Sequence, residues 1–261
     1  LLPLPPVKKI IATLTALLMA TAAFAQPAAS AQPKPTPAPA TPAAPVAAPK
    51  MLTAWGEKVT PENAWRDYPR PALVRENWTN LNGLWKYAIT PIAAPAAPAE
   101  WTGDILVPFA VESALSGVTK PLTPADALWY RRTFDAPQAR AGHRTLLHFE
   151  AVDYETTVRL NDTKLGTHTG GKLPFSFDLT SALKPGANTF TVRVTDATDS
   201  PGSYQTTGKQ VLKPNGIWYT AVSGIWQTVW LETVPAAHIA ALKIVPRING
   251  RVTIGIIPGQ P

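Results

Sequence analysis

Short apolar segments that alternate with turn residues constrain this chain more than any other feature of its sequence. In the segment TFTVRV (residues 189–194), apolar and polar side chains alternate strictly. A period of two residues places the apolar side chains on one face, which is typical of a half-buried antiparallel strand. We therefore expect Phe190, Val192 and Val194 to face a core.

Similar segments recur along the chain and are separated by turn signals such as Asn161-Asp162 and Pro185-Gly186. Only residues 180–183 have the pattern of a short helix. Many short strands with turns between them predict an all-β sandwich or barrel. The expected strands are residues 84–89, 105–107, 128–134, 144–149, 155–160, 189–194, 225–231, 242–245 and 252–257.

The first part of the chain has a different composition. Lys8 and Lys9 precede an apolar run at residues 10–20, and Ala23-Phe24-Ala25 fits a small-x-small cleavage site. We therefore expect residues 1–25 to be a signal peptide and the protein to be exported, to the periplasm or the extracellular space. The alternative is a buried helix or a membrane anchor. Residues 26–54 are rich in Ala and Pro, which predicts an extended, disordered linker.

The net charge of +7 does not indicate a nucleic-acid partner. Four of the 24 Lys and Arg residues precede Met51, whereas no Asp or Glu does, so the excess charge is concentrated in the leader segment. The remaining basic residues form no stripe along one element. The absence of cysteine excludes disulfides, thiolate metal sites and cysteine nucleophiles.

Several stretches, taken in order, resemble the N-terminal domain of glycoside hydrolase family 2, which includes β-galactosidases, β-glucuronidases and β-mannosidases. The resemblance implies a jelly-roll-like, galactose-binding-like antiparallel β-sandwich at residues 55–235. It also implies that an immunoglobulin-like β-sandwich begins at residues 236–261. The stretches are RPALVRENWTNLNGLWKYAI (70–89), ILVPFAVESALSG (105–117), LWYRRTF (128–134), residues 146–194 and SGIWQTVWLE (223–232).

In that family, a TIM barrel with two catalytic glutamates follows these domains, and its acid/base lies in an Asn-Glu dipeptide. This sequence contains no Asn-Glu dipeptide. The resemblance thus implies a non-catalytic N-terminal part of an exported retaining glycosidase, whose partners are the barrel and a carbohydrate substrate. A stand-alone carbohydrate-binding module and a structural or interaction domain remain alternatives.

The sequence indicates no cofactor and no metal site, because the four histidines lack metal-ligand spacing. We expect no nucleic-acid partner and no membrane association after signal cleavage, and the oligomeric state stays open. Two carboxylate pairs, Asp153 with Glu155 and Asp196 with Asp199, are expected to be turn caps or solvated charges rather than a glycosidase pair.

The segment between residues 195 and 223 is long for a loop of an all-β domain, and it is both polar and aromatic. Packing of Trp218 and Tyr219 against another domain is an equal alternative to sugar binding, and a salt bridge is the favoured alternative for Glu112. The candidate substrate-binding residues are Asp199, Lys209, Gln210, Trp218, Tyr219 and Glu112.

The stretch SGIWQTVWLE (223–232) is expected to contain one strand at residues 225–231. On such a strand Trp226 and Trp230 would share a face. Both faces are largely apolar, so the two rings are expected to pack in a core or between domains rather than to stack on sugars.

Overall fold

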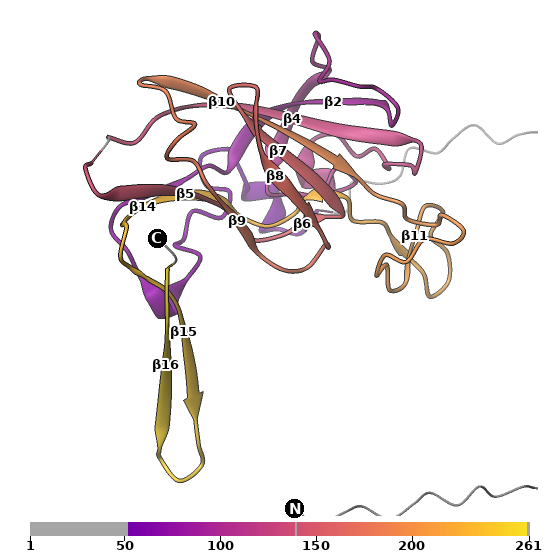
Figure 1. Ribbon diagram of the computed structural model, residues 1–261. Coiled ribbons are helices and arrows are strands. Elements are labelled where there is room, and N and C mark those ends of the chain that lie inside the picture. The colour runs from indigo at the N-terminus through magenta and orange to yellow at the C-terminus, as the bar shows by residue number, and fades with distance from the viewer. Residues whose placement is uncertain (1–51, 139, 260–261) are drawn as a thin grey trace, which may run out of the picture. The chain divides into compact units, whose positions relative to one another are not determined.

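A computed structural model of the chain describes residues 52–138 and 140–259 (Figure 1). The predicted signal peptide and nearly all of the predicted linker lie outside the described residues. Two antiparallel sheets form the main domain, and three further strand pairs accompany them. The expected all-β sandwich is confirmed.

The larger sheet has six strands in the order β3-β2-β4-β10-β7-β8, and every neighbouring pair is antiparallel. Only β8 was not expected from the sequence. Its strands are β2 (Gly83–Pro91), β3 (Gly103–Val107), β4 (Asp126–Asp135), β7 (Glu155–Leu160), β8 (Thr163–Thr169) and β10 (Ala187–Thr195).

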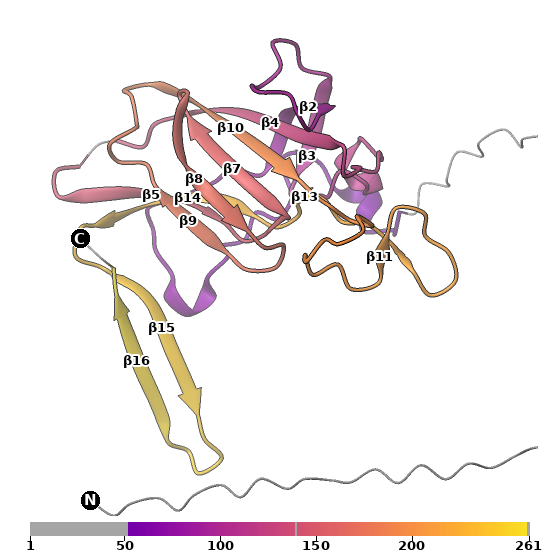
Figure 2. The ribbon, with the colours of Figure 1, turned by 45° about the vertical axis from the view of Figure 1, so that its right-hand side comes forward.

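The smaller sheet has four strands in the order β1-β14-β5-β9, and it is also antiparallel (Figure 2). β1 and β9 were not expected, because they are only three and four residues long. Its strands are β1 (Trp78–Asn80), β5 (His143–Phe149), β9 (Phe175–Asp178) and β14 (Val229–Pro235).

The core lies between the two sheets and follows the period of two in each strand. Phe190, Val192 and Val194 of β10 are fully buried in it, as predicted. The smaller sheet supplies alternate residues of β5 and β14, among them Phe149 and Leu231. Burial of these apolar side chains is the main source of stability in a domain without disulfides.

Three further strand pairs and three 3-10 helices complete the described part of the chain. Among these residues there is no α-helix, and none of the helices could span a membrane. Residues 180–183 form a turn rather than the expected short helix. The elements are β6 (Val152–Asp153) with β13 (Gly224–Ile225), β11 (Gln210–Val211) with β12 (Tyr219–Thr220), β15 (Ile239–Pro246) with β16 (Val252–Pro258), η1 (Gly56–Lys58), η2 (Pro71–Leu73) and η3 (Ala114–Ser116).

The single strand expected at residues 225–231 is interrupted. Ile225 pairs with Val152 of β6, whereas Val229 pairs with Phe149 of β5. Three residues therefore lie between the paired positions on one chain segment and only two on the other, which is a β-bulge. The bulge ends the alternation that the prediction relied on, so Trp226 and Trp230 do not belong to one strand.

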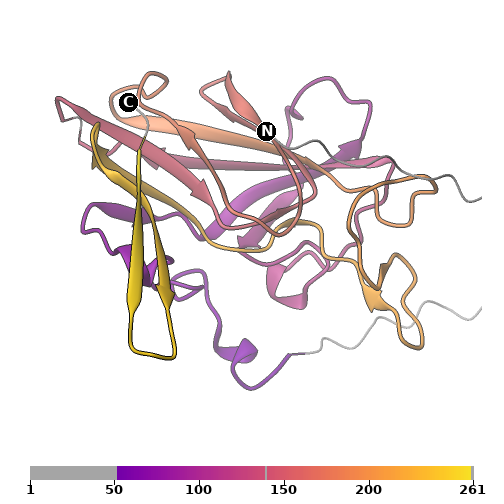
Figure 3. The same ribbon diagram turned by 60° about the horizontal axis from the view of Figure 1, so that its bottom comes forward.

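Residues 63–77, which precede β1 and are here called the covering segment, lie over the outer face of the smaller sheet (Figure 3). The ring of Tyr68 contacts the rings of Trp78 and Trp230 edge-on, and the Arg70 guanidinium lies 4.7 Å from the Trp230 ring centroid. Trp230 is fully buried. It therefore packs in a second apolar layer, on the side of β14 that faces away from the sandwich core.

A buried ion-pair network lies in the same layer. Arg70 contacts Glu232 at 2.7 Å and Arg75 contacts it at 2.9 Å, while Nε2 of His148 lies 3.1 Å from the same carboxylate. Burial alone would raise the pKa of Glu232, but the His148 hydrogen bond and the Arg70 charge outweigh it and hold that pKa below its usual value. Glu232 thus joins the covering segment to β14 and β5.

The hairpin of β15 and β16 pairs with neither sheet of the sandwich. Arg70 and Arg75 donate hydrogen bonds to the carbonyls of Ala240 and Ile239 at its base. Farther along the hairpin, the side chains of Ile254 and Ile256 are exposed. An isolated hairpin with exposed isoleucines lacks the partner strands that would bury them.

Candidate functional site

The loop between β10 and β13 is closed at its base by a pair of hydrogen-bonded side chains. The hydroxyl of Ser223 donates to Oδ2 of Asp196 at 2.7 Å. The other oxygen of Asp196 accepts from the Thr198 amide at 3.0 Å and from Nε2 of Gln205 at 2.6 Å. Asp196 is therefore a turn cap, as expected, and it also connects the two ends of the loop.

Two predicted substrate-binding residues hold the inside of this loop in place. Oε1 of Gln210 accepts from the Val222 amide at 2.6 Å, and Oδ2 of Asp199 accepts from the Leu212 amide at 2.6 Å. Asp199 has a left-handed backbone with φ of 61°, which aspartate tolerates better than most residues. The loop backbone therefore fixes the orientation of both side chains, and the second polar atom of each side chain is not used in these bonds.

The other predicted loop residues are exposed. Trp218 and Tyr219 are 46% and 63% exposed, and no other aromatic ring of the described residues stacks on them. Lys209 is also exposed, and its carbonyl accepts from the Tyr219 amide at 2.8 Å in the β11–β12 pair. The loop projects beyond the ends of β10 and β13 (Figures 1 and 2). It therefore presents an exposed aromatic and basic surface beyond the ends of these strands.

Glu112 reaches the base of the same loop from the connection between β3 and β4. Its Oε2 accepts from the Ser223 amide at 2.9 Å, and its Oε1 accepts from the Leu122 amide at 3.5 Å. Burial raises the pKa of Glu112, although the hydrogen bonds with Ser223 act in the opposite direction. Glu112 forms no ion pair with any described residue, so the expected salt bridge is wrong.

Asp153 is the third carboxyl at the loop base. It is only 5% exposed and pairs across β6 and β13 with Gly224. Burial, and next the charge of Asp196, raise the pKa of Asp153 to about 7, while Lys172 opposes this shift. The expectation of a turn cap or solvated charge is wrong for Asp153, because the strand pair encloses it.

The turn at Gly170-Gly171 packs against this carboxyl. A Cβ atom at Gly171 would overlap the Asp153 side chain, so only glycine fits there. The Gly171 carbonyl accepts from Nε1 of Trp226 at 2.8 Å. Trp226 is thus a packing residue of the loop base, in agreement with the expectation that it does not stack on sugars.

Three carboxyls, from Glu112, Asp153 and Asp196, therefore surround Ser223. Glu112 and Asp196 hold the loop through hydrogen bonds, and Asp153 can take up a proton near neutral pH. No group of three or more His, Asp or Glu side chains in residues 52–138 and 140–259 is arranged to hold a metal ion. The site can therefore form hydrogen bonds and bind a proton at Asp153, beneath the exposed rings of the loop.

The structure brings five of the six predicted residues into one loop and adds Glu112 at its base. The roles of Asp153 and Ser223 were not predicted from the sequence. For Asp153, the available signal was its position directly after Ala151 and Val152, which are both buried. An aspartate that continues an apolar run is more often enclosed than one in a polar turn.

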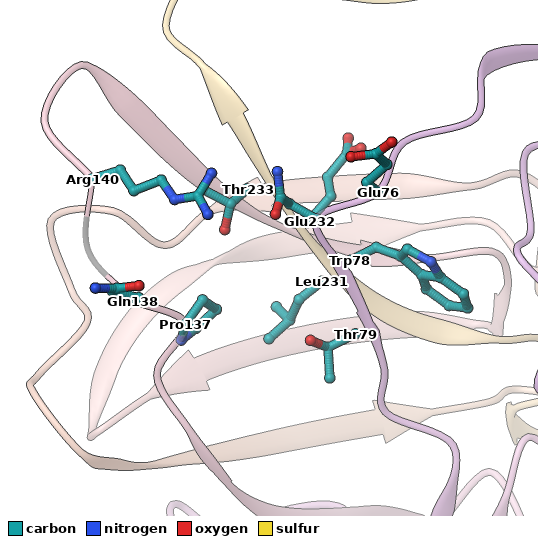
Figure 4. Close-up of a pocket in the computed structure, with 10 residues that line it drawn as sticks. Glu76, Trp78, Thr79, Pro137, Gln138, Arg140, Leu231, Glu232 and Thr233 are labelled. Atoms are coloured by element: carbon teal, nitrogen blue, oxygen red, sulfur yellow. The ribbon is translucent and has the colours of Figure 1, made fainter.

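A hollow of about 230 Å³ lies over β1 and β14, apart from the loop 196–223 (Figure 4). Glu76, Trp78, Arg140 and Thr233 are among the residues that line it. None of the residues predicted to bind substrate lines it, so it is not the site that the sequence indicates.

Residues 107–235 match the family model described as the sugar binding domain of glycosyl hydrolases family 2. The chain is 32% identical over 125 residues to a β-galactosidase of Bacteroides ovatus, which covers 48% of the chain and 13% of the relative. It is 30% identical over 129 residues to a β-glucuronidase of Formosa agariphila, which covers 49% of the chain and 12% of the relative. The chain thus spans about one eighth of the length of these relatives.

The fold is similar to that of solved β-glucuronidases. The structure of the Bifidobacterium dentium β-glucuronidase complexed with coumarin-3-O-glucuronide matches with a TM-score of 0.54 and 22% sequence identity. The match covers 72% of this chain and 37% of that one. The similarity extends the family match to the three-dimensional arrangement of the strands.

Proposed function

Because residues 107–235 belong to the sugar-binding domain of the family 2 glycosyl hydrolases, we propose that the chain is the N-terminal part of an exported glycoside hydrolase. The whole enzyme would hydrolyse terminal β-linked sugars with retention, through a glycosyl-enzyme intermediate formed on one of two carboxylates. Those carboxylates would lie in a barrel outside this chain. The family match is the observation that carries the proposal.

Within that enzyme, the sandwich is a non-catalytic support whose loop 196–223 helps to form the substrate entrance. The exposed rings of Trp218 and Tyr219 suit the apolar C–H face of a pyranose, and Lys209 beside them suits a hydroxyl or a carboxylate. Asp199 and Gln210 hold the loop in shape for this contact. Glu112 acts at the base by fixing Ser223.

The hairpin of β15 and β16 is proposed to begin the immunoglobulin-like domain. Its exposed side chains, such as Ile254 and Ile256, support this, because further strands of a sandwich would bury them. Export is proposed from the signal-peptide pattern at residues 1–25 and the Ala/Pro-rich linker that follows it.

The first test is to sequence the gene beyond the codon for Pro261. A continuing reading frame that encodes a barrel with an Asn-Glu strand end and a second glutamate would support the proposal. The longer protein should then hydrolyse a nitrophenyl β-galactoside or β-glucuronide, and the present chain should hydrolyse neither. A stop codon at that point, or hydrolysis by the present chain, would contradict the proposal.

The role of the loop is tested in that longer protein by the substitutions Trp218→Ala and Tyr219→Ala. Each should lower kcat/KM by about tenfold, which corresponds to ~1.4 kcal/mol of lost transition-state stabilisation. The matched control is Trp55→Ala, because Trp55 is 80% exposed and lies outside the loop. Equal kcat/KM values for all variants would assign the loop a purely structural role.

A further inference from the structure

The bulge between β13 and β14 opens onto a hollow of about 420 Å³. This volume falls within the roughly 300–1,000 Å³ that is usual for small-molecule sites. Bulges often occur next to functional sites, where they redirect a side chain. The residues that line the hollow include Trp65, Asp67, Tyr68, Glu150, Gln227 and Thr228.

Trp65 is held in this hollow in an unfavourable backbone conformation. Its φ is 44°, in the left-handed region that bulky residues rarely occupy. Its carbonyl accepts hydrogen bonds from Nδ2 of Asn80 at 2.8 Å and from Nδ2 of Asn82 at 2.9 Å. The surrounding structure thus compensates for a strained conformation, an arrangement that concentrates at ligand sites.

The strained tryptophan is nevertheless not buried. Its indole makes an edge contact with Phe109 at 6.2 Å between centroids and remains 46% exposed. If its role were core packing alone, the same ring would be covered like Trp85 or Trp230, which are at most 1% exposed. Trp65 therefore presents a rigid aromatic surface to the solvent in the hollow.

Unpaired polar groups surround that ring. The side chains of Asp67 and Gln227 form no hydrogen bond or ion pair with any residue in the described part of the chain. Glu150 uses Oε1 to accept from Nε1 of Trp230 at 2.7 Å, and no described residue donates to its Oε2. Carboxylate oxygens that accept and an amide that both donates and accepts are the groups that recognise sugar hydroxyls.

Asn82 connects the bulge to the tryptophan. It is fully buried and its Nδ2 also donates to Oγ1 of Thr228 at 3.3 Å, while its Oδ1 accepts from the Val229 amide at 3.0 Å. One side chain therefore fixes both Trp65 and the two residues that follow Gln227. The hollow is pre-formed by the fold and does not depend on loop 196–223.

We propose that this hollow binds one neutral hexopyranose unit, which stacks on Trp65 and donates hydroxyl hydrogen bonds to Asp67 and Glu150. Gln227 then contacts a further hydroxyl. No Lys or Arg lines the hollow, whereas two carboxylates do. A uronic acid would place a third negative charge beside them, so the site selects neutral sugars against uronates.

The test is a titration of the chain with methyl β-D-galactopyranoside and methyl β-D-glucopyranoside, with methyl β-D-glucuronide as the anionic comparison. Saturation-transfer NMR and tryptophan fluorescence report the binding. At least one neutral glycoside should bind saturably, and the glucuronide should bind more weakly. Trp65→Ala should weaken the affinity about tenfold, equivalent to ~1.4 kcal/mol, and Gln227→Ala should also weaken it.

Two tryptophan controls locate the binding. Trp55→Ala and Trp101→Ala should both retain the native affinity, because neither residue lines the hollow or belongs to loop 196–223. Thermal unfolding of each variant separates a lost site from a lost fold, and Gln227→Ala tests the site if Trp65→Ala is unstable. Absence of saturable binding, equal binding of the glucuronide, or native affinity in both Trp65→Ala and Gln227→Ala would overturn the proposal. None of these results bears on whether a barrel follows this chain.

Discussion

The hydroxyl of Ser223 donates a 2.7 Å hydrogen bond to the carboxylate of Asp196, and this bond joins the two ends of a long loop. Asp196 ends the run of buried residues that leaves β10, and Ser223 precedes β13. The exposed rings of Trp218 and Tyr219 depend on this closure for their positions. The geometry of the candidate site is therefore set at its buried base.

Asp196→Ala should destabilise the domain by about 2 kcal/mol, because several buried donors, including the Ser223 hydroxyl, lose their acceptor. Urea unfolding measures this loss, and limited proteolysis within residues 197–222 should become faster. The control is Asp199→Ala, which removes one exposed hydrogen bond and should cost less than about 1 kcal/mol. An equal cost for both variants would contradict the role of Asp196 as the loop closure.

Asp153 should make the stability of the domain depend on pH near neutrality. Its pKa rises from 3.8 to about 7 on folding, so the folded state binds a proton that the unfolded state has lost. The resulting stabilisation is fully present below pH 3.8 and is lost as the pH rises through about 7. Thermal unfolding between pH 5 and 8 should therefore show a falling Tm.

The matched variant is Asp153→Asn, which keeps the size of the side chain and cannot ionise. Its stability should change less than that of the native chain between pH 5 and 8, by at least about 1.4 kcal/mol, the equivalent of one pKa unit. Parallel pH profiles for the two proteins would show that Asp153 is ionised in the folded state throughout this range.

Glu232 should make the stability of the domain fall at acidic pH, in the opposite direction to the effect of Asp153. Its pKa is lowered on folding, so its contribution is present above the unfolded value of 4.5 and is lost as the pH falls through the folded pKa. Glu232→Gln should cost about 2 kcal/mol at pH 7, because Arg70 and Arg75 lose their shared partner. The fall of Tm between pH 5 and pH 3 should also become shallower in this variant.

The control for Glu232 is the surface pair of Lys86 and Asp104, whose side chains are 53% and 46% exposed. Asp104→Asn should change the stability by no more than about 1 kcal/mol, because solvent screens an exposed ion pair. If Glu232→Gln lowers the free energy of unfolding no more than Asp104→Asn does, the buried network does not anchor residues 63–77.

Gly224→Ala should cost about 3 kcal/mol or more. The position has a φ of +84°, and an added Cβ would overlap the hydroxyl of the fully buried Tyr130, which accepts from the Ile225 amide at 3.0 Å. Gly208→Ala is the control, since its φ is +64° but nothing lies within 4 Å of the added atom. It should cost about 1–2 kcal/mol from the backbone alone, and chemical denaturation compares the two.

Alternation in the sequence was sufficient to predict most of the long strands. β7 begins and ends where it was expected, and β10 differs only at its ends. This success has a simple cause, because successive side chains of a strand point to opposite faces and only one face of each sheet meets the core. β8 was missed because its side chains are mostly exposed or partly exposed and therefore carry no apolar period.

The order and alternation of the residues were enough to predict an all-β sandwich, and they indicated the polar, aromatic loop before Ser223 as the candidate site. The break in the strand after that loop could not be predicted in this way, since the bulge at residues 226–228 depends on Asn82 and Gly171, which are distant in sequence. The same holds for the burial of Asp153 and the exposure of Trp65. Burial of a polar or aromatic side chain depends on what other segments pack over it, and local sequence does not contain that information.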